Sequence, residues 1–349
     1  MVFLHTRIFL TEIGKSYKNS MKIAILDDYQ DCVRHLECFR LLDGHDVKVF
    51  TSSARGVVQL ALRLREFDAL VLIRERTVLS RQLINKLPNL KLISQTGKVS
   101  GHIDVEAATA RGVVIVEGVG DPAAPAELTW ALIMAATRRI PQYAAHLRDG
   151  LWQTASINPE LNTLGTALKG RTLGIWGYGR IGQLVAGYGK AFGMRVAIWG
   201  RDASLEAAVR DGYLAAASKD ALFEQADVLS LHLRLNDATR DIVTEKELSR
   251  MKPTSLFVNT SRAELVAEGV LEAALHRGRP RFAALDVFHV EPLPPDTPLL
   301  RIPTVLATPH LGYVEKDSYE LYFRAAFQNI VDFANGTPKH VLNPDALKQ

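Results

Sequence analysis

Short aliphatic runs alternate with segments of helical periodicity along most of this 349-residue chain. From Met21 onward the runs KIAIL, VKVF, ALVLI, KLISQ and VVIVE are each separated by such a segment. Continuous apolar runs are typical of strands buried on both faces, and their alternation with helices is the pattern of a parallel sheet. The sequence therefore predicts an α/β protein whose first part is built on a parallel sheet.

A second series of strands follows a helical bridge. The segment ELTWALIMAATRRIPQ predicts one long helix that ends at Pro141. Beyond it, TLGIW, RVAIW, DVLSLHL, TSLFVNT, RFAALDV and TVLATPH predict about six parallel strands, the size of a full dinucleotide-binding sheet. A last helix, DSYELYFRAAFQNIVDFANG, is expected to end at Gly336. Two parallel-sheet domains also suit the length of the chain.

The run TLGIW leads directly into a glycine-rich turn that opens a helix. Gly177, Gly179 and Gly182 form the pattern GxGxxG, with Tyr178 inside it. The first glycine permits the tight turn, the second lets a pyrophosphate approach the backbone, and the third lets helix and strand pack closely. The unpaired N–H groups at the start of the helix favour an anion there. The turn therefore predicts an NAD(P) site.

The residues after the next strand leave the choice of cofactor open. At Gly200 an NAD site would usually offer a carboxylate to the ribose, and Arg201 follows it. A missing carboxylate and an added guanidinium would suit the 2′-phosphate of NADP. Alternatively, Asp202 serves the ribose and Arg201 is a solvated loop residue. We expect NAD(P), with the choice between the two unresolved.

Polar residues gather at the ends of the predicted strands. In an open α/β sheet, ligands bind outside the carboxyl ends of the strands, so residues there are expected to share one cleft. The residues at such ends are Gly177, Arg201, His232, Arg262, Asp286 and His310.

With these residues in place, the chain resembles the D-isomer-specific 2-hydroxyacid dehydrogenase family, and within it the D-3-phosphoglycerate-dehydrogenase-like members. The resemblance extends from Met21 to Pro344. It rests on the segments ISQTGKVSGHIDVEAATARGV, LKGRTLGIWGYGRIG, TRDIVTEKELSRMKPTSLFVNTSRAELV, ALDVFHVEPLP and LATPHLG, of which the last two are specific.

The resemblance implies a Rossmann NAD(P)-binding domain inserted into a flavodoxin-like substrate domain. The substrate domain would comprise residues 21–122 plus 314–349, and the Rossmann domain residues 123–313. Residues 1–20 are expected to be an N-terminal extension or a misassigned start, because Met21 opens a natural first strand and the preceding residues make no convincing signal peptide. A homodimer and a cleft that closes by hinge motion are also implied.

The resemblance further implies roles for individual residues. Arg262 would bind the substrate carboxylate and carbonyl, His310 would act as acid and base, and Glu291 would pair with His310. Asp286 would hold the nicotinamide. Backbone groups of Gly97, Lys98 and Val99 would face the substrate, and the remaining positions that match cofactor contacts are Arg180, Ile181, Leu233, Thr260, Ser261 and Gly312.

Hydride transfer between a hydroxy acid and a nicotinamide requires these residue types independently of the resemblance. Oxidation of a secondary alcohol needs a base for the hydroxyl proton, and the reverse reaction needs an acid for the developing alkoxide. Histidine serves both directions near neutral pH, and a neighbouring carboxylate orients it. The guanidinium of Arg262 can pair with a carboxylate in fork geometry and polarise the adjacent C=O. Formate and phosphite dehydrogenases are rivals, but formate oxidation releases no hydroxyl proton, so Glu291 favours a hydroxy acid.

The expected substrate is a small anionic 2-hydroxy or 2-oxo acid, with 3-phosphoglycerate one candidate. Arg74 and Arg76 in LIRERT either bind a substrate phosphate or are surface charges, and Lys98 adds charge at the substrate loop. Glyoxylate or hydroxypyruvate reduction with NADPH is an alternative. A nicotinamide-sensing corepressor on the same fold is another. Arg234 stands where the family usually has proline, and Ala263 stands where it usually has glycine. Both differences affect the expected geometry of the loops that contact the cofactor.

Composition excludes several other classes. The formal net charge of +4 is small, and the basic residues form no stripe with interleaved aromatic residues, so nucleic acid is not an expected partner. No apolar run is long enough to span a membrane. Cys32 and Cys38 form neither a disulfide framework nor a zinc spacing, so we expect no metal and a cytoplasmic location.

Overall fold

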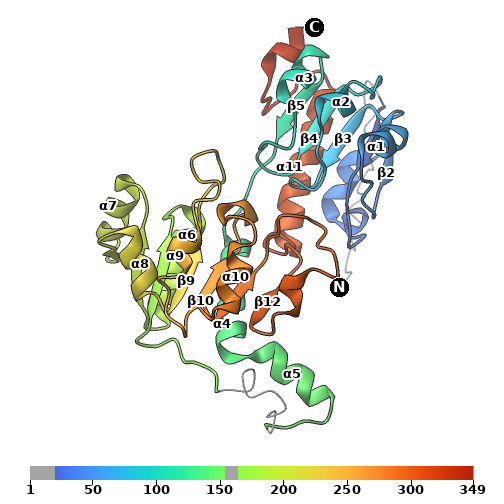
Figure 1. The fold of residues 1–349 in the computed structure, drawn as a ribbon. Helices are drawn as coiled ribbons and strands as arrows, with labels where there is room; N and C mark the ends of the chain where they lie inside the picture. The colour runs from blue at the N-terminus through green and yellow to red at the C-terminus, as the bar shows by residue number, and fades with distance from the viewer. Residues whose placement is uncertain (1–19, 154–163, 349) are drawn as a thin grey trace, which may run out of the picture. The chain divides into compact units, whose positions relative to one another are not determined.

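A computed structural model describes residues 20–153 and 164–348, which form two compact units. The first unit combines the chain up to Gly120 with the chain from Lys316 onward, and the second is the continuous segment Asp121–Glu315. Each unit is built on a parallel sheet (Figure 1). The predicted α/β class with two parallel sheets is therefore confirmed.

The first unit contains five parallel strands, and all five match the predicted runs. Their order is β2-β1-β3-β4-β5, so the direction of strand succession reverses between β1 and β3, as in flavodoxin-like sheets. The aliphatic side chains of four strands are buried, which explains their lack of alternation, whereas β2 at the sheet edge alternates between exposed and half-buried residues. The strands are β1 (Lys22–Ile25), β2 (Asp46–Val49), β3 (Ala69–Leu72), β4 (Leu92–Gln95) and β5 (Val114–Glu117).

The longest helix of this unit is α11 (Lys316–Ala334), which the sequence predicts to within a few residues. It lies against β4, where the hydroxyl of Ser94 donates to the carbonyl of Ala326 at 2.8 Å. Gly336, with φ +77°, follows the helix, in agreement with the expected end. The smaller elements are η1 (Val33–His35), η2 (Glu37–Leu42), α1 (Val57–Leu64), α2 (Arg81–Ile84), α3 (Val105–Ala110) and η5 (Pro344–Lys348).

The second unit has a sheet of seven parallel strands in the order β12-β11-β10-β9-β6-β7-β8. The six predicted strands are present, but the expected number is one too low. The missed strand is β8 (Leu214–Ala215), an exposed edge strand of two residues that is too short to produce a pattern. The others are β6 (Thr172–Trp176), β7 (Arg195–Trp199), β9 (Val228–Leu231), β10 (Leu256–Asn259), β11 (Phe282–Leu285) and β12 (Val305–Ala307).

Side chains from the two faces of this sheet pack into two hydrophobic cores. Phe257 of β10 points into one core with Phe223, whereas its neighbour Val258 points into the other with Ile175. Helices cover both faces, as a parallel sheet requires. Besides the two helices of the bridging segment 123–148, the helices of this unit are α6 (Arg180–Ala191), α7 (Asp202–Arg210), α8 (Lys219–Gln225), α9 (Glu245–Leu248), η3 (Ala263–Leu265), α10 (Val270–His276) and η4 (Pro298–Arg301).

The predicted long helix is present, but its expected end at Pro141 is wrong. The chain instead forms α4 (Ala123–Arg138) and then α5 (Ile140–Arg148), with Arg139 between them at φ 56°. Pro141 lies in the first turn of α5, where its fixed φ suits a helix and its missing N–H costs nothing. In Figure 1, α5 extends away from the seven-stranded sheet. Among the described residues, no helix is long and apolar enough to cross a membrane.

Candidate active site

The glycine turn has the geometry that its sequence predicts. Gly177 follows β6 at φ +102°, in a region that favours glycine, and a Cβ there would collide with the carbonyl of His232. A Cβ on Gly182 would collide with the carbonyl of Gly177. Both glycines are therefore required by close backbone packing between the turn, α6 and the loop after β9.

Gly179 has a different reason to be glycine. It is the N-cap of the 12-residue helix α6, and a Cβ built on it would meet no atom within 4 Å. The space over this residue is therefore open, at the helix end where backbone N–H groups and the helix dipole attract an anion. The turn thus fits the pyrophosphate of a dinucleotide, which Gly179 would let approach the backbone.

Other predicted cofactor residues surround this turn. Arg180 is exposed at the start of α6, Ile181 packs on the core, and Leu233 approaches Gly177. The side chain of Tyr178 is buried, and its hydroxyl donates to Oδ2 of Asp211 at 2.6 Å. Burial raises the pKa of this phenol, with Asp211 adding to the effect. Only the backbone of Tyr178 therefore remains to contact a cofactor.

His232 lies beneath the glycine turn and is not a second acid or base. Its Nε2 is 2.9 Å from Oγ of Ser230, and burial lowers its pKa to about 4. The imidazole is therefore neutral under ordinary conditions. Its backbone carbonyl is the group that Gly177 approaches, so the residue supports the turn.

The end of β7 is bonded to the glycine turn. The N–H of Gly177 donates to the carbonyl of Trp199, the last residue of β7, at 2.9 Å. Gly200 and Arg201 follow at once. Arg201 is exposed, is the N-cap residue of α7, and belongs to no ion pair among the residues that the structure describes.

The residues after β10 are held by hydrogen bonds within the protein. Oγ1 of Thr260 is 2.6 Å from Oγ1 of Thr129, and the hydroxyl of Ser261 donates to the carbonyl of Leu231 at 2.7 Å. Arg262 is half-buried, and its Nη1 donates to the carbonyl of Ser261 at 2.6 Å. The Nδ2 of Asn259 donates to the carbonyl of Arg262 at 2.8 Å. These bonds fix the backbone from which the Arg262 side chain extends.

His310 and Glu291 are in direct contact. Nδ1 of His310 lies 2.7 Å from Oε2 of Glu291, and Oε1 of the same carboxylate accepts from the N–H of Phe288 at 2.9 Å. His310 follows β12 and has φ 54°, and its ring meets that of Tyr313 edge to face at 5.7 Å between centroids. The carboxylate is thus anchored on one oxygen and directed at the imidazole with the other.

Asp286, at the end of β11, holds the backbone next to His310. Its side chain is fully buried and accepts from the N–H groups of Leu311 and Gly312, at 2.7 and 2.9 Å, and from the hydroxyl of Thr308 at 2.7 Å. Burial raises its pKa, and these donors together with His310 oppose that effect. The expected nicotinamide contact of Asp286 stays a prediction, while the observed bonds position the loop that carries His310.

The predicted substrate residues of the first unit form one loop after β4. The N–H of Val99 donates to Oε1 of Glu117 at 2.8 Å, and Nζ of Lys98 lies 2.7 Å from Oε2 of the same carboxylate. The N–H of Gly97 donates to the carbonyl of Gln95 at 3.0 Å. The N–H groups of Gly97 and Val99 are thus bonded within the protein, and the expected contact of the loop backbone with a substrate stays a prediction.

Arg74 lies beside this loop. It has φ 52°, its N–H donates to Oγ1 of Thr96 at 3.1 Å, and a Cβ on Gly97 would collide with its guanidinium. Arg76 instead donates to the carbonyl of Asp27 at 2.6 Å and stacks over the ring of Tyr29 at 4.4 Å. Of the two arginines in LIRERT, Arg74 is thus the one against the predicted substrate loop.

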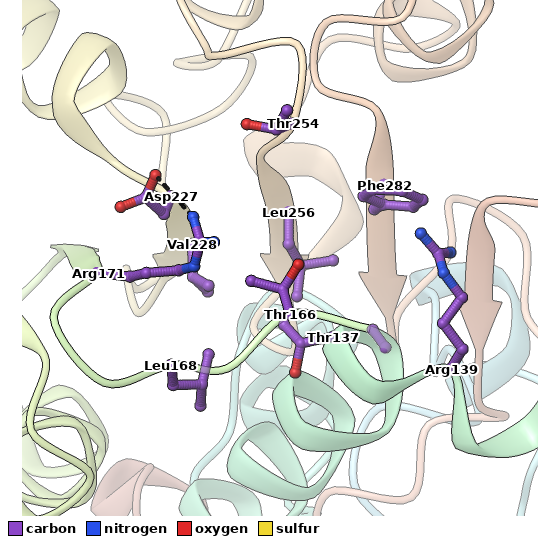
Figure 2. Close-up of a pocket in the computed structure, with 11 residues that line it drawn as sticks. Thr137, Arg139, Thr166, Leu168, Arg171, Asp227, Val228, Thr254, Leu256 and Phe282 are labelled. Carbon is purple, nitrogen blue, oxygen red and sulfur yellow. Dashed lines mark ion pairs between the residues drawn. The ribbon is translucent and has the colours of Figure 1, made fainter. Parts of the chain in front are cut away.

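A small pocket lies at the amino ends of strands in the seven-stranded sheet (Figure 2). Asp227, Leu256 and Phe282, which line it, stand at or just before the amino ends of β9, β10 and β11. The guanidinium of Arg139 stacks over Phe282 at 4.2 Å. The predicted site residues of this unit follow the strands and therefore lie at the carboxyl ends, away from this pocket. Within the described ranges, no group of three or more His, Cys, Asp or Glu could hold a metal ion.

Glu117 is a residue of the candidate site that the sequence analysis did not single out. It is the last residue of β5, and its position at a carboxyl end was the available signal. Thr308 and Tyr313 were also missed, although both stand within three residues of His310. Their contacts with Asp286 and His310 depend on the tertiary fold, so only the structure shows them.

A glycine turn on a seven-stranded parallel sheet and an imidazole paired with a carboxylate define a nicotinamide-dependent oxidoreductase. The family model for the D-isomer specific 2-hydroxyacid dehydrogenase NAD binding domain matches residues 130–312. The chain belongs to the D-isomer specific 2-hydroxyacid dehydrogenase family and is an oxidoreductase that acts on a CH–OH group with NAD(P). The resemblance seen in the sequence is thus confirmed.

Individual relatives agree with this assignment. The chain is 38% identical over 293 residues to the glyoxylate reductase of Aeropyrum pernix, covering 83% of this chain and 87% of that protein. It is 36% identical to the D-3-phosphoglycerate dehydrogenase of Methanocaldococcus jannaschii, with 84% of this chain but 53% of that longer protein covered. A crystal structure from Ralstonia solanacearum, named "putative D-3-phosphoglycerate dehydrogenase oxidoreductase", is 60% identical with a TM-score of 0.91 and covers 94% of this chain and 98% of that chain.

Proposed function

We propose that the chain interconverts a small D-2-hydroxy acid and its 2-oxo acid, with the chemistry carried by His310, Glu291 and Arg262. The observation that carries the proposal is the 2.7 Å contact between Nδ1 of His310 and Oε2 of Glu291. With Nδ1 directed at the carboxylate, Nε2 is the nitrogen that remains for a substrate oxygen.

The proton steps follow from this arrangement. When bound, NAD(P)H would supply the hydride for reduction, and NAD(P)+ would accept it in oxidation. Nε2 of His310 would take the hydroxyl proton during oxidation and give one to the developing alkoxide during reduction. Glu291 would hold the ring in one orientation and stabilise the imidazolium when it forms. General acid and base work of this kind contributes on the order of a hundredfold to ten-thousandfold in rate.

Arg262 would bind the substrate carboxylate. Its backbone is fixed on both sides by the bonds of Asn259 and Ser261, so the guanidinium extends from a rigid base. A planar fork of donors matches a carboxylate and can polarise the adjacent carbonyl. We expect Arg262→Ala to lower kcat and raise KM together while cofactor affinity is retained. Near-normal kcat/KM in this variant would contradict the assignment.

The substrate is proposed to be a small anionic 2-hydroxy acid, with 3-phosphoglycerate one candidate. The names of the similar proteins point to 3-phosphoglycerate and to glyoxylate. The position of Arg74 against Gly97 supports a substrate with an anionic tail, because a phosphate is a good partner for a guanidinium. Lys98 contributes less to such a site, because Glu117 neutralises it.

A panel of acids tests the proposal. Glyoxylate, hydroxypyruvate, phenylpyruvate and 3-phosphohydroxypyruvate would each be assayed with NADH and with NADPH, and the corresponding hydroxy acids in reverse. We expect turnover with at least one acid and its loss in His310→Ala. A protein that binds the cofactor but turns over none of these acids would instead support the nicotinamide-sensing alternative.

The family resemblance also leads us to propose a homodimer, and α5 supports it. Its nine residues include no buried one, and Ile140 and Leu147 within it are exposed apolar residues, as are Trp152 and Leu164 farther along the chain. Apolar side chains on an extended segment are typical of a subunit interface. Light scattering should give twice the chain mass, and Leu147→Asp should shift it toward the monomer. A wild-type monomer at micromolar concentration would contradict the dimer.

A further inference from the structure

The residue after β7 determines what can meet the adenosine ribose. Gly177 of the pyrophosphate turn is bonded to Trp199 at the end of β7, so Gly200 is next to the turn. A Cβ on Gly200 would lie 3.3 Å from Cβ and 3.7 Å from Oγ of Ser204. A hydroxyl therefore lies beside the place where an NAD-specific site carries its carboxylate.

Arg201 supplies a positive charge at the same place. Its side chain is exposed, and no carboxylate of residues 20–153 and 164–348 forms an ion pair with it. Its backbone is extended, with φ −69° and ψ 158°, and its carbonyl accepts from the N–H of Ser204 at 2.8 Å. This bond fixes Ser204 relative to Arg201, so the hydroxyl and the guanidinium come from one tight turn.

Asp202 is the residue that would favour NAD. It is three residues past the end of β7, and it is the first residue of α7 rather than the last of the strand. The usual ribose carboxylate stands at the strand end, where its two oxygens accept from the ribose hydroxyls. Gly200 occupies that position and has no side chain. The acceptor that would repel a phosphate is therefore missing, while two donors are present.

From this geometry we propose that Arg201 and Ser204 bind the 2′-phosphate of NADP(H), and that the enzyme prefers NADP(H) to NAD(H). The inference rests on the proposed function, because it assumes that the glycine turn binds the pyrophosphate. Guanidinium and hydroxyl donors to a phosphate make charge-assisted bonds, which are stronger than neutral ones. We expect at least about a tenfold tighter binding of NADPH than of NADH.

Direct binding measurements test the proposal without turnover. Dissociation constants for NADPH and NADH would be measured by calorimetry at one fixed ionic strength. Adenosine 2′,5′-bisphosphate and adenosine 5′-monophosphate would be compared in the same way, because they lack the nicotinamide and isolate the ribose end. Arg201→Met should reduce the preference for the 2′-phosphorylated ligand about tenfold while NADH affinity is kept. Arg210→Met, at the other end of α7, is the matched control and should leave the preference unchanged.

Gly200→Asp provides a second variant that acts in the opposite direction. The added carboxylate should weaken NADPH and strengthen NADH, whereas the neutral Gly200→Asn tests crowding against Ser204 alone. Equal or tighter binding of NADH by the wild type, or an unchanged preference in Arg201→Met, would overturn the inference. Failure of the wild type to bind either dinucleotide would refute the proposed function instead.

Discussion

Oε2 of Glu291 lies 2.7 Å from Nδ1 of His310, and Oε1 of the same carboxylate accepts the N–H of Phe288. The two oxygens thus have different partners. Oε1 anchors the carboxylate to its own turn, and Oε2 orients the imidazole. We predict that His310→Asn lowers kcat on the order of a hundredfold to ten-thousandfold, because the proton acceptor is lost.

A variant of the carboxylate separates orientation from charge. Glu291→Gln keeps the shape and a group able to accept from Nδ1–H, but it cannot stabilise an imidazolium by charge. We expect an intermediate loss of kcat with little change in cofactor dissociation constant. Steady-state kinetics and calorimetry on both variants check this, and the exposed His289→Asn serves as a control. Wild-type kcat in His310→Asn would show that another residue handles the proton.

Two glycines of the turn should fail in different ways when alanine replaces them. A Cβ on Gly182 collides with the carbonyl of Gly177, so Gly182→Ala should destabilise the protein by about 1–3 kcal/mol through overpacking. A Cβ on Gly179 meets no atom within 4 Å, so Gly179→Ala should lose only the small stability difference between a glycine and an alanine N-cap, and it should lose affinity for the dinucleotide.

Thermal unfolding and dinucleotide titration together distinguish these outcomes. The expected pattern is a lowered Tm for Gly182→Ala, and a smaller change in Tm with weakened dinucleotide binding for Gly179→Ala. If Gly179→Ala bound NAD(P)H as the wild type does, the pyrophosphate would not approach this residue.

Glu117 should position the substrate loop of the first unit. It holds Val99 by the N–H and Lys98 by Nζ, and its own carbonyl accepts from Nδ2 of Asn329 in α11 at 3.0 Å. Glu117→Ala removes both loop contacts, so we expect KM for the acid to rise about tenfold, while the dissociation constant of the dinucleotide is unchanged.

A comparison with Lys98→Met tells the two contacts apart. That variant loses the ion pair but retains the Val99 bond, and an exposed pair contributes little, so its KM should change by less than about threefold. Rescue of KM by Glu117→Gln, which can still accept from Val99, would support the positioning role. An unchanged KM in Glu117→Ala would exclude it.

The sequence predicts the parts of this protein that depend on local pattern. The five strands of the first sheet appear in the sequence as short runs, aliphatic where the strand is buried and alternating in the edge strand β2. The glycine turn of the second sheet appears as GxGxxG, because close backbone packing requires those glycines. Strand β8 escapes prediction because two exposed residues carry no periodicity. Pro141 misleads because proline suits both the end of one helix and the first turn of the next.

The candidate site shows the same division. His310 and Glu291 are found through specific sequence motifs, and the structure places their side chains in direct contact. The bonds of Asp286 to Leu311 and Gly312, and the side chain of Tyr178 buried beside Asp211, result from tertiary packing that no local pattern encodes. Residues 1–19, part of the proposed N-terminal extension, lie outside the described residues.

Glu247, outside the candidate active site, is expected to make the free energy of unfolding depend on pH in the acid range. It is buried, its Oε1 is 2.7 Å from Nζ of Lys219, and its Oε2 accepts from the N–H and hydroxyl of Thr244 at 2.8 and 2.6 Å. Burial acts to raise the pKa of Glu247, but the bonds from Lys219 and Thr244 outweigh it and lower the pKa to about 2. The folded protein therefore binds the Glu247 proton less tightly than the unfolded chain.

The sign of the pH effect follows. A carboxyl group with a depressed pKa in the folded state stabilises above its ordinary pKa of 4.5 and loses that contribution as pH falls toward about 2. We expect Glu247→Gln to lower the free energy of unfolding at pH 7 by about 1–3 kcal/mol, and the difference from wild type to shrink below pH 4.5. Urea unfolding between pH 7 and pH 3.5 measures this, with Glu245→Gln on the exposed face of α9 as the control. A difference that stayed constant with pH would show that Glu247 stabilises the helix by shape and capping rather than by its charge.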